Sequence, residues 1–164
     1  MFDYVLIQEE KLKFLKSSSK LVEQIEDLCS CKLNFSDVIE IDCDDPLRAL
    51  RIKEVLKAFG RGFEIDDCLN LLDESYSLEI IEVPEFSGKS RNRQIELKGR
   101  VIGKEGKSKN LIEKYAEVKL AIYGKTISII GKWDRVRVAR EAVEMLLSGR
   151  LHGSVYRFLE SQTR

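Results

Sequence analysis

The chain repeats one pattern in its two halves, and this repeat constrains the fold more than any other feature. SSSK of the first half corresponds to GKSK of the second, CKLNF to VKLAIY, and EVLKAFGRG to EMLLSGR. The paired segments lie roughly 90 positions apart, which is typical of duplicated domains, because the repeats of solenoid proteins are much shorter. We therefore predict two domains, residues 1–74 and 75–164.

The second half predicts the element order β-α-α-β-β-α and then one extra helix. Residues 76–83 are rich in strand-forming residues and stop at Pro84, after which we expect a loop. The further expected elements are a helix over RNRQIELKG, a helix from about 107 to 115, a hairpin of VKLAIY and TISII across Gly124-Lys125, a long helix that ends at Gly149, and a short helix near 154–158.

The first half predicts the same order. A strand, FDYVLIQ, precedes the helices EEKLKFLK and SKLVEQIEDLC, and CKLNF pairs with VIEIDC across Ser36-Asp37. Asp45 is expected to cap the next helix, because Pro46 fits the first helical position. An extra helix is expected near 66–72. The residues of SKLVEQIEDLC that are expected to face the core are Leu21, Val22, Ile25 and Leu28.

These elements predict an α+β fold in which each half is a three-stranded sheet with helices on one face. The net charge of zero hides a division: up to Phe86 there are 10 Lys and Arg against 20 Asp and Glu, and from Ser87 onward 18 against 8. This asymmetry indicates that the halves have different partners. The alternative is that they neutralise each other across an internal interface.

Cysteine and hydropathy patterns exclude several classes of protein. The four cysteines form no CxxC pair and share the chain with one histidine, so we expect no metal site and no cofactor. Buried, reduced thiols are the prediction for all four. No apolar run approaches the roughly 18 residues of a membrane span, and the N-terminus lacks the features of a signal peptide. A cytoplasmic location is therefore expected.

GRVIGKEGKSKNLIEKY, residues 99–115, looks like a phosphate-binding loop that leads into a helix. A Walker A loop needs a glycine five positions before the glycine of Gly-Lys-Ser, but Val101 lies there. A dinucleotide-binding fingerprint would need glycine at the same position. The remaining motif is Gly103-Lys104-Glu105-Gly106, a GxxG.

A β-α-α-β-β-α unit with GxxG between its first two helices resembles a type I KH domain, so the chain resembles two tandem type I KH domains. GRVIGKEGK, YGKTISIIG, VAREAVEMLLSG and VYRFLE resemble the C-terminal KH domain of the Partner of Nob family of small-subunit ribosome assembly proteins, and DDPLRALRIKEVLKAFGRGF extends the resemblance through the first half. The resemblance implies binding of single-stranded RNA near the 3′ end of small-subunit rRNA and assistance to its processing. It also implies contact with the processing endonuclease and, in archaea, with the alpha subunit of initiation factor 2.

The KH resemblance implies that the GxxG loop clamps a few nucleotides of single-stranded backbone. Glycines let the peptide approach the phosphates, and the N-terminus of the next helix adds positive partial charge. Glu105 is expected to point to solvent. The candidate RNA-binding residues are the loop (Gly103, Lys104, Glu105, Gly106), the cations Arg91, Arg93, Arg100, Lys107 and Lys109, and the apolar groove walls Ile102, Ile112 and Leu120, with Val101 beside them.

Other polar residues of the second half suggest no catalysis. Its acidic residues form no arrangement with His, Cys or Ser that is typical of acid-base or nucleophilic chemistry, so a nuclease or NTPase is disfavoured and no enzyme is expected. His152 is either a turn residue or a contact to RNA or a partner. The arginines of the long helix, expected as a solvated face or as further RNA contacts, are Arg135, Arg137 and Arg140.

The first half departs from the KH pattern at the loop. It reads Lys16-Ser17-Ser18-Ser19, without glycine and in an acidic setting. Serine hydroxyls can contact phosphate, but the close backbone approach and the long-range attraction are lost. We predict that this half binds little RNA and is a docking surface or a support for the second. Two functions stay open: an RNA-binding assembly factor without catalysis, or an adaptor whose acidic half docks a processing nuclease or the initiation factor subunit.

Overall fold

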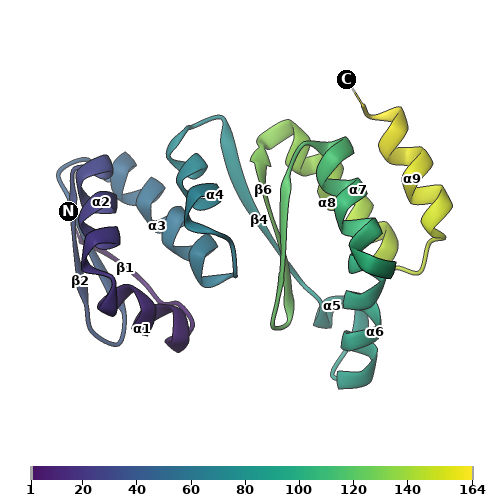
Figure 1. Ribbon diagram of the computed structural model, residues 1–164, viewed down its shortest axis with the longest axis horizontal. Helices are drawn as coiled ribbons and strands as arrows, with labels where there is room; N and C mark the ends of the chain where they lie inside the picture. The colour runs from purple at the N-terminus through teal and green to yellow at the C-terminus, as the bar shows by residue number, and fades with distance from the viewer. Residues whose placement is uncertain (1, 164) are drawn as a thin grey trace. The chain divides into compact units, whose positions relative to one another are not determined.

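The structure is a computed structural model and describes residues 2–163. The chain divides into two compact units, Met1–Glu74 and Ser75–Arg164, and each is described by itself (Figure 1). Within residues 2–163, every helix is too short or too polar to span a lipid bilayer.

The second unit is an antiparallel sheet of three strands in the order β4-β6-β5, with α7 and α8 on the same face (Figure 1). The predicted strands, helices and two-residue hairpin loop are all confirmed. Its elements are β4 (Tyr76–Glu82), α5 (Pro84–Ser87), α6 (Arg91–Ile102), the 3₁₀ turn η2 (Lys104–Gly106), α7 (Lys107–Ala116), β5 (Lys119–Tyr123), β6 (Thr126–Lys132), α8 (Trp133–Leu147) and α9 (His152–Ser161).

The core of the second unit lies between the sheet and its helices. Apolar residues recur at helical spacing and turn one side of each helix inward. The buried residues include Leu97 and Val101 of α6, Ile112 of α7, Ile127 and Ile129 of β6, and Val136, Ala139, Val143, Leu146 and Leu147 of α8. The last five form one apolar side of α8.

Apart from the single turn α5, the first unit has the same order of strands and longer helices along the chain, and its sheet has the corresponding order, β1-β3-β2, all antiparallel. The duplication seen in the sequence is therefore also present in the structure. The elements are β1 (Phe2–Val5), α1 (Glu9–Ser17), α2 (Ser19–Cys29), β2 (Cys31–Phe35), β3 (Ile39–Cys43), α3 (Pro46–Gly60), α4 (Ile65–Leu69) and the 3₁₀ turn η1 (Asn70–Leu72).

One hydrogen bond occurs at the same place in both units. The Glu26 carboxylate of α2 accepts from the Leu33 N–H of β2 at 2.8 Å, and the Glu113 carboxylate of α7 accepts from the Leu120 N–H of β5 at 3.0 Å. Each bond ties the second helix to an edge strand. The predicted helix cap is also present, because the Asp45 carboxylate accepts from the Leu47 N–H at 3.0 Å.

Three local expectations were wrong. Leu28 is exposed, because Ile25 and Cys29, one turn apart, form the buried side of α2 and adjacent helical residues point in directions about 100° apart. The first hairpin loop has three residues, 36–38, since Phe35 pairs with Ile39. Residues 84–87 form one helical turn rather than a loop, because proline fits the first helical position.

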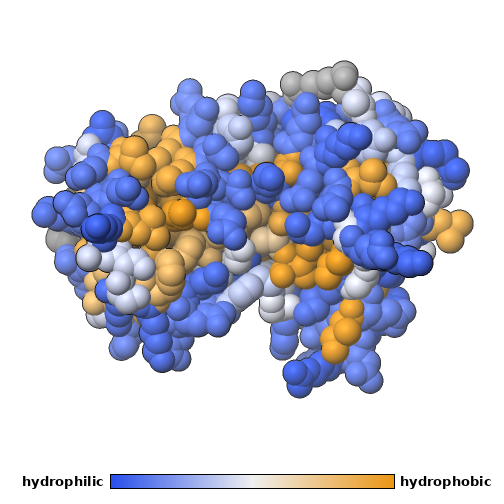
Figure 2. Space-filling model, in the orientation of Figure 1, coloured by the Kyte–Doolittle hydropathy of each residue, from blue (hydrophilic) through white to orange (hydrophobic). Residues whose placement is uncertain are grey.

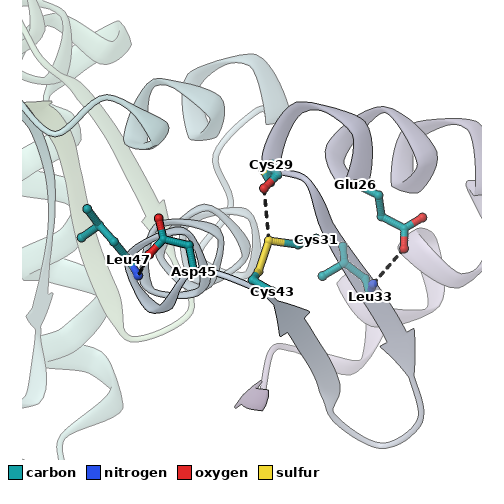
Figure 3. Close-up of a disulfide and its surroundings, with 7 residues drawn as sticks. All are labelled: Glu26, Cys29, Cys31, Leu33, Cys43, Asp45 and Leu47. Atoms are coloured by element: carbon teal, nitrogen blue, oxygen red, sulfur yellow. Dashed lines mark hydrogen bonds between the residues drawn. A yellow bond between two sulfur atoms is a disulfide. The ribbon is translucent and has the colours of Figure 1, made fainter. Parts of the chain in front are cut away.

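Two cysteines form a disulfide, so the prediction of four reduced thiols was wrong. Cys31 of β2 and Cys43 of β3 lie directly opposite each other on paired strands, with Cα atoms 4.5 Å apart, and their sulfur atoms are bonded (Figure 3). Their separation of 12 positions matches no motif. Only the strand register brings the side chains within bonding range.

Cys29 and Cys68 are free and buried, as predicted. Burial raises the pKa of Cys29 to about 11 and that of Cys68 to about 12, because removal from water disfavours the thiolate. In the described part of the chain, no group of three or more His, Cys, Asp or Glu is arranged to hold a metal ion.

Candidate nucleic-acid interface

The GxxG sequence forms a tight loop between the end of α6 and the start of α7. Gly103 has φ +75°, Glu105 +54° and Gly106 +77°. Glycine adopts this left-handed region readily, whereas a residue with a side chain is strained there. The Gly106 N–H donates to the Gly103 carbonyl at 3.2 Å and closes the turn. The backbone is thus held in a conformation of the kind that clusters at functional sites.

Gly103 is also required by packing. A Cβ at this position would lie 2.7 Å from the backbone nitrogen of Ser108, which is buried in the first turn of α7. The Ser108 hydroxyl lies 2.9 Å from the Tyr156 hydroxyl of α9. At Gly106 the nearest atom to such a Cβ is 3.7 Å away, on Asn110, so only the backbone angle requires glycine there.

Two lysines are exposed at the loop. Lys104 lies within it and Lys107 is the first residue of α7. The N-terminus of α7 adds positive partial charge at the same place. Glu105 is exposed, as predicted. The two ammonium groups and the N-terminus of α7 together form a surface suited to consecutive phosphates.

The other predicted cations are less directly available to a ligand at the loop. The Lys109 ammonium lies 3.5 Å from the Glu113 carboxylate, and the Arg93 guanidinium lies 2.8 Å from Glu96. Arg91 begins α6, so about 18 Å of helix separates it from Gly103. Only a longer ligand would reach both the loop and the start of α6.

Arg100 is engaged within the fold rather than at the loop. Its Nε donates to the Leu146 carbonyl at 2.9 Å, and its Nη2 donates to the Arg150 carbonyl. The first of these carbonyls lies in the last turn of α8, where helix carbonyls lack partners and carry negative partial charge. The guanidinium therefore fastens α6 to the α8–α9 connection, and its expected contact with phosphate stays a prediction.

Of the four apolar residues predicted to line the groove, one is exposed and three are buried. Ile102 is 38% exposed. Val101, Ile112 and Leu120 belong to the core, where a base would reach them only if the core opened. Their expected contact with a base stays a prediction, which their burial does not favour.

A second exposed isoleucine was missed in the sequence. Ile95 is 59% exposed and lies two turns before Ile102 on the same side of α6. Between them, the Lys98 ammonium donates to the Gly124 carbonyl in the β5–β6 turn at 2.8 Å. Figure 2 shows a small hydrophobic area among hydrophilic side chains in the region of α6. The spacing of Ile95, Lys98 and Ile102, three and seven residues apart, could have predicted that they share one face of α6. This face borders the hairpin turn.

Arg135 was wrongly expected on a solvated face of α8, although Arg137 does lie there. Arg135 is buried, and its guanidinium donates to the carbonyls of Tyr115, Ala116 and Gln162 at 2.8, 3.1 and 2.9 Å. It thereby joins the C-terminal ends of α7 and α9.

Arg140 is also engaged by the protein itself. Its guanidinium donates to the Glu144 carboxylate at 2.6 Å and to the Glu79 carboxylate. The hydrogen bond with Glu144 is the main reason that the pKa of Arg140 is raised. This side chain is consequently a poor candidate for contact with RNA.

The first unit has no comparable loop. α1 ends at Ser17 and α2 begins at Ser19, so Ser18 alone separates them, with φ −111°. The Ser17 hydroxyl donates to the Phe14 carbonyl at 2.9 Å. This geometry agrees with the prediction that the first unit lacks a loop whose backbone can approach phosphate closely.

A sheet of order β4-β6-β5 with a GxxG loop between α6 and α7 defines the second unit as a type I KH domain. Residues 77–164 match the eukaryotic-type KH domain, KH-domain type I, in the form found in PNO1 proteins. With the relatives described next, this match shows that the chain belongs to the PNO1/Dim2 family of rRNA-processing factors.

Two curated relatives and one solved structure illustrate the similarity. A KH domain-containing protein of Methanocaldococcus jannaschii is 42% identical over 118 residues, which are 72% of this chain and 52% of that protein. The pre-rRNA-processing protein PNO1 of Coccidioides immitis is 36% identical over 108 residues, 63% of this chain and 41% of that protein. This chain thus spans about half the length, or less, of these relatives.

The solved structure is a chain in the crystal structure of an a/eIF2alpha–aDim2p–rRNA complex from Pyrococcus horikoshii. It matches with a TM-score of 0.87 and 30% sequence identity, over 99% of this chain and 93% of that one.

Proposed function

We propose that this chain binds single-stranded RNA through the GxxG loop of its second unit and acts as an assembly factor of the small ribosomal subunit. The observation that carries the proposal is the loop itself. Its left-handed backbone at Gly103 and Gly106, the exposed lysines 104 and 107 and the N-terminus of α7 meet at one surface. KH domains use such a loop to clamp the backbone of about four nucleotides.

The RNA that we propose is the 3′ region of small-subunit rRNA. One relative is a pre-rRNA-processing protein, and the Pyrococcus complex contains rRNA together with a/eIF2alpha. The choice of the 3′ region rests on the family resemblance. Bases next to the clamped phosphates would lie on the exposed face of α6 that carries Ile95 and Ile102.

The chain's role is to bind and position RNA rather than to cleave it. The surface around the loop carries backbone amides and ammonium groups, which hold phosphates. Two nearby side chains of types that serve as nucleophile or base are engaged: Ser108 with Tyr156, and the His152 ring with the Arg100 carbonyl at 3.0 Å. Assistance to processing then consists of presenting the RNA to a separate nuclease. The cytoplasmic location stays a prediction.

The adaptor function is the second candidate, and it rests on the surface of the first unit. Figure 2 shows hydrophobic areas among hydrophilic side chains on this unit. Six of its large apolar side chains are more than half exposed: Tyr4, Leu6, Phe14, Leu28, Leu47 and Leu50. Such surfaces are typical of protein contacts. We infer that this acidic unit is a docking surface, for the processing endonuclease or the initiation factor 2 alpha subunit.

The RNA proposal is tested by fluorescence anisotropy with a labelled RNA that matches the 3′ end of small-subunit rRNA, across a salt series. The Lys104→Asp, Glu105→Asp double variant should bind at least about tenfold more weakly, because it places negative charge where phosphates lie. The slope of log affinity against log salt should fall by about 0.7 for each lost phosphate contact.

Lys114→Asp is the matched control, because this exposed lysine lies in the last turn of α7, at the other end of the helix, and its change alters the net charge equally. It should bind within about twofold of the native protein. Equal binding by the native protein and the loop variant would reject the loop as the RNA clamp, and a scrambled RNA measures the contribution of sequence.

A further inference from the structure

A cavity of about 390 Å³ lies on the side of the GxxG loop that faces α9. Its walls come from the last turns of α6, the loop, and the first turns of α7 and α9. Its volume is in the range of small-molecule sites in proteins. The main polar and aromatic side chains that line it are Lys104, Lys107, Ser108, His152 and Tyr156.

This cavity is separate from the face of α6 described above. Its α6 residues are Glu96, Gly99 and Arg100, which share one side of the helix at spacings of three and four. Ile95 and Ile102 do not line the cavity, and Gly99, four residues after Ile95 and three before Ile102, lies where the two surfaces adjoin. The loop therefore has an apolar face on one side and this cavity on the other.

The cavity combines rings with positive charge. The His152 and Tyr156 rings lie with centroids 6.1 Å apart and tilted by 58°, and both side chains are half-buried. The Lys107 ammonium lies 5.8 Å from the centre of the Tyr156 ring. Two helices of ten residues, α7 and α9, begin here, so both add positive partial charge.

The rings are held in place by hydrogen bonds. The Tyr156 hydroxyl bonds the buried Ser108, and the His152 ring bonds the Arg100 carbonyl at 3.0 Å. The Arg100 guanidinium is itself bonded to the end of α8 and to the α8–α9 connection. Arg100 therefore holds the His152 side of the cavity in place through both its carbonyl and its side chain. A rigid pair of rings beside two ammonium groups suits a base and its phosphate.

We propose that this cavity is a second nucleotide site, which holds one further nucleotide of the RNA strand clamped by the GxxG loop. The proposal rests on the proposed function. Gly103, Lys104 and Lys107 line both the loop surface and the cavity, so a strand on the loop passes the cavity mouth. The base stacks on the Tyr156 ring with the tilted His152 ring at its edge, and its phosphate contacts the two lysines.

RNA fits this cavity better than an acidic peptide does. A peptide carboxylate would use the lysines but would leave the aromatic rings without a stacking partner. Glu96 also lines the cavity and is paired with Arg93, so its charge is partly balanced. An amino group of a base can donate a hydrogen bond to this carboxylate, whereas an acidic side chain cannot.

The test compares RNAs of roughly four and about eight nucleotides, because the loop alone holds about four. Tyr156→Ala should weaken binding of the longer RNA about tenfold, the loss expected for one stacking platform, and change binding of the shorter RNA by less than about twofold. Tyr156→Phe keeps the ring and should bind both RNAs nearly as the native protein does. Equal binding of the longer RNA by Tyr156→Ala and the native protein overturns the proposal.

A measurement on the native protein covers the case in which Tyr156→Ala does not fold. The chain has one histidine, so its imidazole NMR signal reports on His152 alone. The signal should shift with the longer RNA and stay in place with the shorter one. If it stays in place while anisotropy shows the longer RNA bound, or if only poly-glutamate shifts it, the cavity is not a nucleotide site. If neither RNA binds at all, the proposed function itself fails.

Discussion

The junction between the first two helices differs between the two units, although it lies at the same place in the same order of elements. In the second unit, residues 103–106 form a loop with three left-handed residues. In the first unit, Ser18 alone separates two helices and has an ordinary φ of −111°. The sheet order and the bond from a helix glutamate to an edge-strand amide are the same in both. The scaffold therefore does not depend on the loop, and the loop gives the second unit the surface that we propose binds phosphate.

A second difference concerns the arginine at the third position of the last long helix. Arg48 in α3 is exposed, whereas Arg135 in α8 is buried and bonds three carbonyl oxygens. One of these carbonyls belongs to Gln162, just after α9. The end of α7 and the residue after α9 thus hold this arginine within the second unit.

The largest expected effect is that of Gly103→Ala. The alanine would need a left-handed backbone, and its Cβ would meet the Ser108 backbone, so we expect the second unit to lose about 4 kcal/mol of unfolding free energy. Urea unfolding measures the change. The control is Gly99→Ala in α6, where nothing lies within 4 Å, and it should add about 0.5–1 kcal/mol. Equal stability of Gly103→Ala and the native protein would show that the loop is not held in this conformation.

The arginine pair should give a smaller effect. Arg135→Met leaves carbonyls of α7 without their donors, and we expect a loss of about 3 kcal/mol. Arg48→Met, at the matching position of the first unit, should change the free energy by less than about 0.5 kcal/mol. Thermal or urea unfolding of both variants checks the difference. If the two variants lost a similar amount of unfolding free energy, the burial of Arg135 would not make it more important for stability than Arg48.

The smallest expected effect is on RNA binding by a grafted loop. Replacing Lys16, Ser17, Ser18 and Ser19 by Gly, Lys, Glu and Gly, in a protein that carries the Lys104→Asp, Glu105→Asp change, should raise RNA affinity by less than about twofold. Acidic surroundings repel phosphate at long range, and a one-residue junction has no room for the loop. Fluorescence anisotropy with the labelled RNA measures the affinity of the grafted variant. Recovery of native affinity would show that the loop sequence alone makes a KH clamp.

Local patterns predicted most of the architecture. Helical and strand periodicity, Asp45-Pro46 and the GxxG motif depend on residues near each other in the chain, and they predicted the elements correctly, although Leu28 was placed on the wrong side of α2. The candidate site was predicted less fully. The loop and its lysines 104 and 107 lie at one surface, whereas Arg100 is fastened to the end of α8, Ile112 and Leu120 are buried, and Ile95 was missed.

The sequence by itself determined the duplicated order of elements, the position of the loop and the division of charge, because these follow from spacing and composition. Only the tertiary structure decided that Cys31 faces Cys43, that Arg135 is buried while Arg48 is not, and that α9 places Tyr156 beside the loop. Each of these depends on strand register or on contacts between residues far apart in the chain. Such contacts leave no local signal, since the partners meet only when the whole unit has packed.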